Sequence, residues 1–284
     1  MKQYKNIVIG VDLAEPLEPL LAQAKLFANH QHSHFHLVHV YPALSMTVPY
    51  ATEYEGQLVR DLKVKLEELT QHFAGLAMTT HLVQGNASIE LVKLASSLEA
   101  NLIVVGSHGK HGVELLLGST ANGVLYGCSC DILAVRINKQ GIHDGRDHYK
   151  TVLLATDFSS ESEKIIHLAK QFCDDIKAQL HVISVVPDPA VLASMYQPGV
   201  DDDSLPSVEK KMAHLISTLS ISKSNTRLIA GEPKFEILTY ANEIDTNLIV
   251  VGSHGKNILA SAVLGSTPHA LLHKAKMDVF LSRI

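Results

Sequence analysis

The sequence lacks the features of a secreted, membrane-spanning or disulfide-stabilised protein. Its 284 residues include three cysteines, and Cys128, Cys130 and Cys173 have neither metal-ligand spacing nor the even number of a disulfide framework. No apolar run approaches the roughly 18 residues of a membrane span. Strand-like sequence begins within a few residues of Met1, which leaves no room for a signal peptide. We therefore expect a cytoplasmic protein whose cysteines act as small apolar residues.

The composition also lacks the basic excess that favours nucleic-acid or membrane-surface binding. The formal net charge is -5 and the pI is about 6.4. With 46% hydrophobic and 19% charged residues, nothing indicates disorder. The length favours two domains, given a typical domain of about 150 residues. We expect neither nucleic acid nor membrane as a partner.

One ten-residue stretch, NLIVVGSHGK, occurs twice, at 101–110 and 146 positions later at 247–256. Its four consecutive apolar residues before Gly-Ser-His-Gly are typical of a strand buried on both faces of a parallel sheet. The glycines predict a tight turn where backbone N–H groups can approach an anionic ligand. The duplication predicts two copies of one domain.

Strand-like and helical patterns alternate in both halves. Strand-like runs recur at 7–11, 35–40 and 132–137, and again at 152–155, 180–186 and 279–284. Third strands are expected to end at Gly85 and Gly231, and each half contains amphipathic helical stretches. Each half is therefore predicted to be a doubly wound α/β domain with a parallel sheet and helices on both faces.

The domain boundaries follow from the segments without periodicity. We predict domains at 1–139 and 149–284, joined by a polar, glycine-containing linker at 140–148. Two long polar connections, 41–56 and 187–206, are predicted to be loops of the kind that often cover a site.

Candidate ligand-binding residues follow the strands. Glycine turns and helix N-termini supply N–H groups for phosphate. Asp12 and Asp157 end the first strand of each half, where a carboxylate can accept hydrogen bonds from a ribose or base, or help to hold a metal ion on phosphates. The alternatives are that the glycines serve tight turns alone and that each Asp caps the next helix. The glycine-turn candidates are Gly106, Gly109, Gly118 and Ser119, and their counterparts Gly252, Gly255, Gly265 and Ser266.

Helix starts can also be predicted locally. Ser160 and Glu163 have the spacing of a capping box. Thr267 followed by Pro268 is typical of an N-cap with proline at the first helical position.

Gly-x2-Gly-x9-Gly-Ser after a buried strand, with an Asp that ends the first strand, resembles the universal stress protein family. The resemblance covers nearly the whole chain as a tandem pair. It implies flavodoxin-like five-stranded parallel sheets of order 3-2-1-4-5, paired through their last strands as a pseudo-dimer. It also implies ATP or another adenine nucleotide, with or without Mg²⁺. The implied nucleoside contacts are Asp157 and Val185, and the implied phosphate contacts are Gly252, Gly255, Gly265, Ser266 and Thr267.

The first half departs from this motif. Nine residues separate Gly255 from Gly265, but eight separate Gly109 from Gly118. One missing residue can move the chain by up to roughly 3.5 Å, enough to disrupt a phosphate cradle. We therefore expect one nucleotide per chain, in the second half. The weaker candidates are Asp12, Gly106, Gly109, Gly118 and Ser119.

No catalytic residue is predicted. Ser107–His108 and Ser253–His254 are sequence neighbours, which rarely have catalytic geometry, and no orienting carboxylate is evident. The loops contain no recognisable water-positioning residue or arginine finger, so we expect at most slow ATPase activity.

Histidines alternate at His32, His34 and His36, so they would share a strand face and suggest a metal site. Only His36 has a counterpart, His181, which fits a position of the repeated fold instead. No functional metal site is expected.

Two functions of different classes remain open. The first is a nucleotide-binding regulator of the stress response. The second is an interaction scaffold, or a carrier of small apolar ligands, with the same fold and no nucleotide. A homodimer of tandem chains is compatible with either, and the sequence identifies no protein partner.

Overall fold

The structure is a computed structural model that describes residues 4–14, 17–28, 32–43, 51–71, 75–107, 118–137, 148–188, 205–253 and 264–283. The chain divides into two compact units, Lys2–His148 and Tyr149–Ile284. Except for His148, the predicted linker at 140–148 lies outside the described residues.

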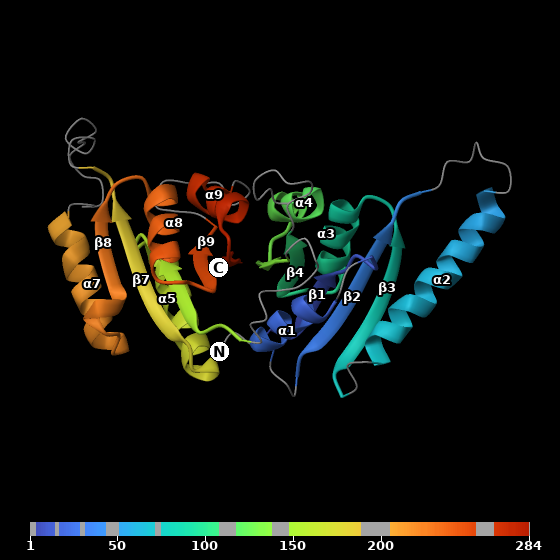
Figure 1. Ribbon diagram of the computed structural model, residues 1–284, viewed down its shortest axis with the longest axis horizontal. Coiled ribbons are helices and arrows are strands. Elements are labelled where there is room, and N and C mark those ends of the chain that lie inside the picture. The colour runs from blue at the N-terminus through green and yellow to red at the C-terminus, as the bar shows by residue number, and fades with distance from the viewer. Residues whose placement is uncertain are drawn as a thin grey trace. The chain divides into compact units, whose positions relative to one another are not determined.

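The first unit is a parallel sheet with helices on both faces (Figure 1). Its strands pair in the order β3-β2-β1-β4-β5, and every pair is parallel. Helix α1 packs on β1, β4 and β5, whereas α3 packs on β1, β2 and α4. The elements are β1 (Asn6–Gly10), α1 (Glu18–Phe27), β2 (His34–Tyr41), α2 (Ala51–Gln71), β3 (Ala77–Gln84), α3 (Ala87–Ser97), β4 (Leu102–Ser107), α4 (Ser119–Gly127) and β5 (Asp131–Arg136).

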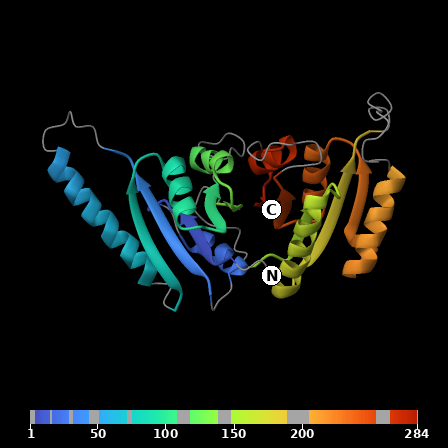
Figure 2. The same cartoon turned by 180° about the vertical axis from the view of Figure 1, so that it is seen from behind.

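The second unit repeats this topology, with the parallel order β8-β7-β6-β9-β10. Helices α8 and α9 lie side by side, as α3 and α4 do, in both views (Figures 1 and 2). The predicted α/β class and the strand order 3-2-1-4-5 are confirmed in each unit. The elements are β6 (Thr151–Ala155), α5 (Ser160–Ile176), β7 (Gln179–Val186), α7 (Leu205–Leu219), the 3-10 turn η1 (Lys223–Asn225), β8 (Thr226–Ala230), α8 (Pro233–Glu243), β9 (Leu248–Gly252), α9 (Ser266–Lys274) and β10 (Asp278–Ser282).

Several predicted boundaries were wrong, and α7, like α2, begins inside a segment expected to be a connection. Helix α2 begins at Ala51, inside the segment expected to be a connection. The N-cap of α5 is Ser159, whose side chain accepts a hydrogen bond from the N–H of Ser162. The N-cap of α9 is Gly265, so Thr267 is the second helical residue and Pro268 the third. The N–H of Gly265 donates to the carbonyl of Ser253 at 3.0 Å, which fixes the glycine at the helix start.

The repeated apolar run forms the centre of each core. Leu102 to Val105 in β4 are at most 3% exposed, and Leu248 to Val251 in β9 are at most 6% exposed. Because each strand lies between two others and is covered by helices, both of its faces are buried. This confirms the prediction made from the uninterrupted β-branched run.

Asn101 and Asn247, the first residues of the two NLIVVGSHGK repeats, form hydrogen bonds with the backbone at the start of each unit. The side-chain oxygen of Asn101 accepts from the N–H groups of Lys5 and Asn6 at 3.0 and 3.2 Å. The oxygen of Asn247 accepts from Lys150 and Thr151 at 2.7 and 3.0 Å. One side chain therefore satisfies two backbone donors that precede or begin the central strand.

A buried tyrosine–aspartate hydrogen bond lies at the same edge of each sheet. The hydroxyl of Tyr4 donates to Asp131 at 2.7 Å, and that of Tyr149 donates to Asp278 at the same distance. All four residues are at most 2% exposed. Burial, with the neighbouring carboxylate, raises the pKa of both tyrosines, so the phenols stay protonated and donate. These bonds connect residues 127 and 129 positions apart.

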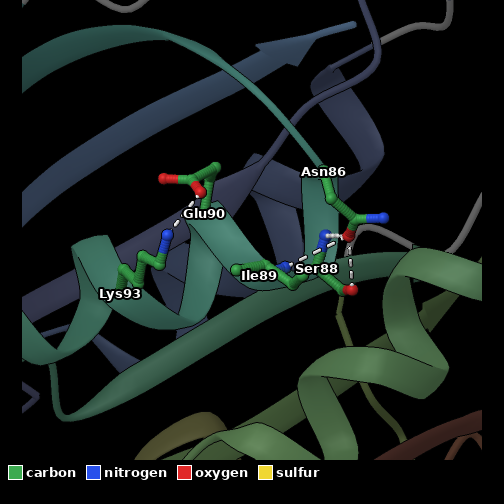
Figure 3. Close-up of polar contacts among 5 residues, drawn as sticks. All are labelled: Asn86, Ser88, Ile89, Glu90 and Lys93. Atoms are coloured by element: carbon green, nitrogen blue, oxygen red, sulfur yellow. Dashed lines mark hydrogen bonds and ion pairs between the residues drawn. The ribbon is translucent and has the colours of Figure 1, made fainter.

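Helix α3 starts with a side-chain cap (Figure 3). The side-chain oxygen of Asn86 accepts from the N–H groups of Ser88 and Ile89 at 3.2 and 3.3 Å, and from the Ser88 hydroxyl at 2.9 Å. Glu90 and Lys93 form an ion pair on the next turn. In the second unit Glu232 is the N-cap of α8, and Pro233 is the first helical residue. Proline has no N–H group, so this position has no backbone donor that would need a partner.

We expect Tyr4→Phe and Tyr149→Phe each to lower the free energy of unfolding of its unit by about 1–3 kcal/mol, because each removes a donor from a buried carboxylate. Urea unfolding followed by circular dichroism measures this loss. Tyr126→Phe, at a side chain that is 50% exposed, is the control and should change stability by less than about 0.5 kcal/mol. Equal and small effects of all three variants would contradict the prediction.

Candidate functional site

The carboxyl edge of the second sheet brings the predicted nucleoside residues together. Strand β6 pairs with β7 at Ala155 and Ile183, and with β9 at Leu154 and Val250. Asp157 lies two residues beyond Ala155, and Val185 lies two beyond Ile183, so the parallel register places them level at one edge. The same reasoning places Gly252 and Ser253 beside the end of β6. This is where the strand order reverses, which is where doubly wound sheets bind ligands.

Asp157 organises the turn between β6 and α5. Its Oδ1 atom accepts from the Ser159 N–H and hydroxyl at 3.0 and 2.8 Å, and from the Ser162 hydroxyl at 2.5 Å. Ser159 in turn caps the helix. Asp157 therefore does not cap α5 itself; it bonds to Ser159, the residue that does. These hydrogen bonds hold the carboxylate at the sheet edge.

The backbone beside Asp157 is constrained in a way that the sequence did not predict. Phe158 has a φ of 55°, in the left-handed region that non-glycine residues seldom adopt. The Thr156 hydroxyl accepts from the Phe158 N–H at 3.0 Å and supports this conformation. The first unit has Val11 at the position of Thr156, which offers no such acceptor.

The end of the glycine turn in the second unit is closed onto β9. Gly265 is buried, and its N–H bonds to the Ser253 carbonyl at 3.0 Å. A Cβ at Gly265 would lie 3.4 Å from that carbonyl and from Pro268 Cδ, in ordinary van der Waals contact with both. Because Gly265 has no side chain, no side-chain cap hydrogen bond forms at the start of α9. The N–H groups of Ser266 and Thr267 therefore belong to an uncapped helix N-terminus.

The first unit holds the same residue types in a more open arrangement. Gly118 is the N-cap of α4 with nearly the same dihedral angles as Gly265, and Ser119 begins the helix. No described residue would lie within 4 Å of a Cβ at Gly118. Asp12 is exposed, and its Oδ1 accepts from the Ala14 N–H at 3.0 Å, a local turn contact.

Gly106 and Gly252 occupy equivalent places near the ends of β4 and β9. Beside Gly106, Arg136 donates to the Ser107 hydroxyl at 3.0 Å. Gly109 and Gly255 lie outside the described residues, as do residues 110–117 and 256–263 that follow them. The predicted consequence of the shorter loop therefore stays a prediction.

A histidine cluster lies on one face of β2 and β3. His34 and His36 stack with ring centroids 4.5 Å apart, and His36 Nδ1 lies 3.1 Å from His81 Nε2. Over the described part of the chain, no group of three His, Cys, Asp or Glu residues has metal-binding geometry. Burial, followed by the neighbouring His34 and His81, lowers the pKa of His36 to about 4, and burial lowers the pKa of His81.

The counterpart in the second unit uses different chemistry. His181 Nδ1 lies 3.2 Å from the Tyr240 hydroxyl. The Arg227 guanidinium lies over the Tyr240 ring at 4.6 Å and pairs with Glu243. His36 and His181 occupy equivalent positions but contact different side chains, His81 and Tyr240. We therefore interpret both histidines as part of the packing of their units.

A pocket of about 460 Å³ lies between α5 and α7. Phe158, the residue after Asp157, lines this pocket. The lining combines apolar and basic side chains, among them Phe158, Ile166, Leu215, Leu219, Lys210 and Lys211. Apart from the amphipathic pattern of the two helices, no sequence signal indicates this pocket.

None of the helices, over the residues described, is long and apolar enough to cross a membrane.

We expect the first unit to lose stability as the pH falls from about 6.5 to 4. His36 in an unfolded chain has a pKa near 6.5, so between these values the unfolded state binds more protons than the folded state. The contribution of neutral His36 to the stability of the first unit is fully present above about pH 6.5. Histidine NMR titration should find His36 neutral at pH 5.5, and His36→Gln should flatten the pH dependence of urea unfolding. A titration midpoint at or above 6.5 would refute this.

The chain resembles known proteins over both units. The family model described as "Universal stress protein family" matches residues 3–136 and 148–283. Universal stress protein A homolog 2 of Coxiella burnetii is 33% identical over 144 residues, which cover 48% of this chain and 98% of that protein. Universal stress protein Mb2028c of Mycobacterium bovis is 24% identical over 238 residues, which cover 81% of this chain and 78% of that protein. The crystal structure of a universal stress protein from Archaeoglobus fulgidus has a TM-score of 0.70 at 21% identity, covering 99% of this chain and 97% of that one, and shows the same fold.

Proposed function

This chain belongs to the universal stress protein family, and we propose that its second unit binds one adenine nucleotide, such as ATP, within a stress-response regulator. The proposal rests on the glycine turn that ends at Gly265. The Gly265 N–H bonds to Ser253 at the end of β9, directly before an uncapped helix. A phosphate at that position would meet both the helix dipole and free backbone donors.

The phosphate donors follow from the start of α9. Ser266 and Thr267 supply two N–H groups and two hydroxyls, whereas Pro268 has no N–H to give. Gly252 and Gly255 complete the proposed cradle because only glycine lets the backbone come close to the phosphates. Mg²⁺, if bound with the nucleotide, would neutralise phosphate charge.

The nucleoside is proposed to lie between Asp157 and Val185. Their register brings both to the carboxyl edge of the sheet, at the ends of β6 and β7. The hydrogen bonds from Ser159 and Ser162 fix the Asp157 carboxylate before a ligand arrives. A fixed acceptor loses little conformational entropy on binding, which favours affinity.

Three differences favour the second unit over the first. Gly265 is packed against Ser253, whereas Gly118 has open space among the described residues. Thr156 supports the Phe158 turn, and the first unit has Val11 there. Among the described residues Asp12 Oδ1 accepts one local turn hydrogen bond, whereas Asp157 Oδ1 accepts three.

The pocket between α5 and α7 favours one second candidate, a carrier of small amphipathic ligands. Leu215 and Leu219 provide apolar surface, and Lys210 and Lys211 provide positive charge at the same pocket. Native mass spectrometry of protein purified without added ligand distinguishes the two, because a nucleotide and an apolar carboxylate differ in mass. Pairing of the two units as a pseudo-dimer, and the linker at 140–148, stay predictions.

Calorimetric titration with ATP should give one site per chain. Gly252→Val should weaken binding at least 100-fold, because the added side chain occupies the space of a phosphate. Gly106→Val is the matched control at the equivalent position near the end of β4, and it should leave both stoichiometry and affinity unchanged. Circular dichroism checks that both variants fold. Two equivalent sites, or a loss only in Gly106→Val, would show that the assignment of the site is wrong.

A further inference from the structure

Two thiols meet in the turn that joins α4 to β5. The Sγ atoms of Cys128 and Cys130 lie 2.9 Å apart, and the N–H of Cys130 donates to Cys128 Sγ at 3.3 Å. Cys128 is 7% exposed, whereas Cys130 is partly exposed and can be reached from solvent. The pair lies at the amino edge of the sheet, at the opposite ends of the strands from the glycine turns.

The fold does not require these thiols. The second unit has Ala275 and Met277 at the equivalent positions. Ala275 is the C-cap of α9 and donates its N–H to Leu271, as Cys128 caps α4 and donates to Val124. The same turn therefore forms with no sulfur–sulfur contact, so the two thiols are not needed to build it.

The sulfur separation indicates which chemistry is favoured. A disulfide bond is about 2.05 Å long, so less than 1 Å of movement separates the thiols from bonding distance. Two thiolates on one tetrahedral Zn²⁺, each about 2.3 Å from the metal, would lie about 3.8 Å apart. Over the described residues no third ligand completes a metal site here. The geometry therefore favours a covalent bond over a shared metal ion.

We propose that Cys128 and Cys130 form a reversible disulfide within one chain when the protein meets hydrogen peroxide. The more exposed Cys130 thiolate attacks one peroxide oxygen, which breaks the O–O bond and forms a sulfenic acid; the released hydroxide becomes water. The Cys128 sulfur then attacks Cys130 Sγ, an S–S bond forms, and the S–O bond breaks to release a second water. Two thiols are oxidised by two electrons, and one peroxide is reduced to two waters.

The surroundings of Cys130 set the speed of this reaction. The hydrogen bond with Cys128, burial and the nearby Asp131 all raise the pKa of the Cys130 thiol. Because the thiolate is the attacking species, the rate should rise about tenfold per pH unit above pH 7. The pair is thus suited to sustained oxidation rather than to brief peroxide pulses.

The test exposes the full reduced chain to hydrogen peroxide and counts thiols. The count should fall from three to one, and peptide mass spectrometry should find one peptide, containing both Cys128 and Cys130, lighter by two hydrogens. Dithiothreitol should restore the thiols. Cys173 is the internal control, because it is 1% exposed and so out of reach of peroxide, and it should stay reduced.

Two variants copy the second unit and keep the turn. Cys128→Ala and Cys130→Met should fold as the native chain does and should show no reversible loss of two thiols. Three thiols remaining after prolonged treatment would overturn the proposal. So would disulfides between chains, oxidation of Cys130 beyond sulfenic acid with no bond to Cys128, or the same two-thiol loss in either variant.

Discussion

The architecture of each unit depends on hydrogen bonds at the amino edge of its sheet, of which the tyrosine–aspartate bonds are buried. Asn101 and Asn247 accept from the backbone where the central strand begins, and so hold β1 to β4 and β6 to β9. The tyrosine before each central strand reaches the aspartate that begins the last strand. A buried carboxylate without such donors would cost several kcal/mol, so the strands are held in one register. Since the side-chain period of a strand is two, a slip by one residue would turn every apolar side chain outward.

The fixed register determines what can happen at the other edge. Because the strands are parallel, setting their starts also sets where they end, and the ends carry Asp157, Val185, Gly252 and Gly265. The second unit then adds local constraints of its own: the Thr156–Phe158 contact and the closed Gly265 turn. Over its described residues the first unit shares the same sheet but shows neither of these two contacts. The proposed difference in nucleotide binding therefore arises from local contacts near the strand ends, and the fold of the two units is the same.

The sequence predicts the fold more fully than the site. The NLIVVGSHGK repeat and the alternation of strand and helix predict two parallel sheets, because buried strands and amphipathic helices have distinct periods. Each half also repeats a Tyr-Lys pair, at Tyr4 and Tyr149, and an aspartate, at Asp131 and Asp278. Their role could not be predicted, because it depends on contacts between residues more than 120 positions apart. Phe158 carries no local signal for a positive φ, since glycine or asparagine is usual there. The thiol contact depends on how α4 ends, and spacing alone did not indicate it.

Photoaffinity labelling with an azido-adenine nucleotide, followed by peptide mass spectrometry, tests the central assignment most directly. The label reports which unit holds the base, independently of affinity and stoichiometry. Labelled peptides are expected from the second unit alone, near Asp157 and Val185, and the label should be lost when ATP competes. Labelling of both units to the same extent, or labelling that ATP does not displace, would contradict it.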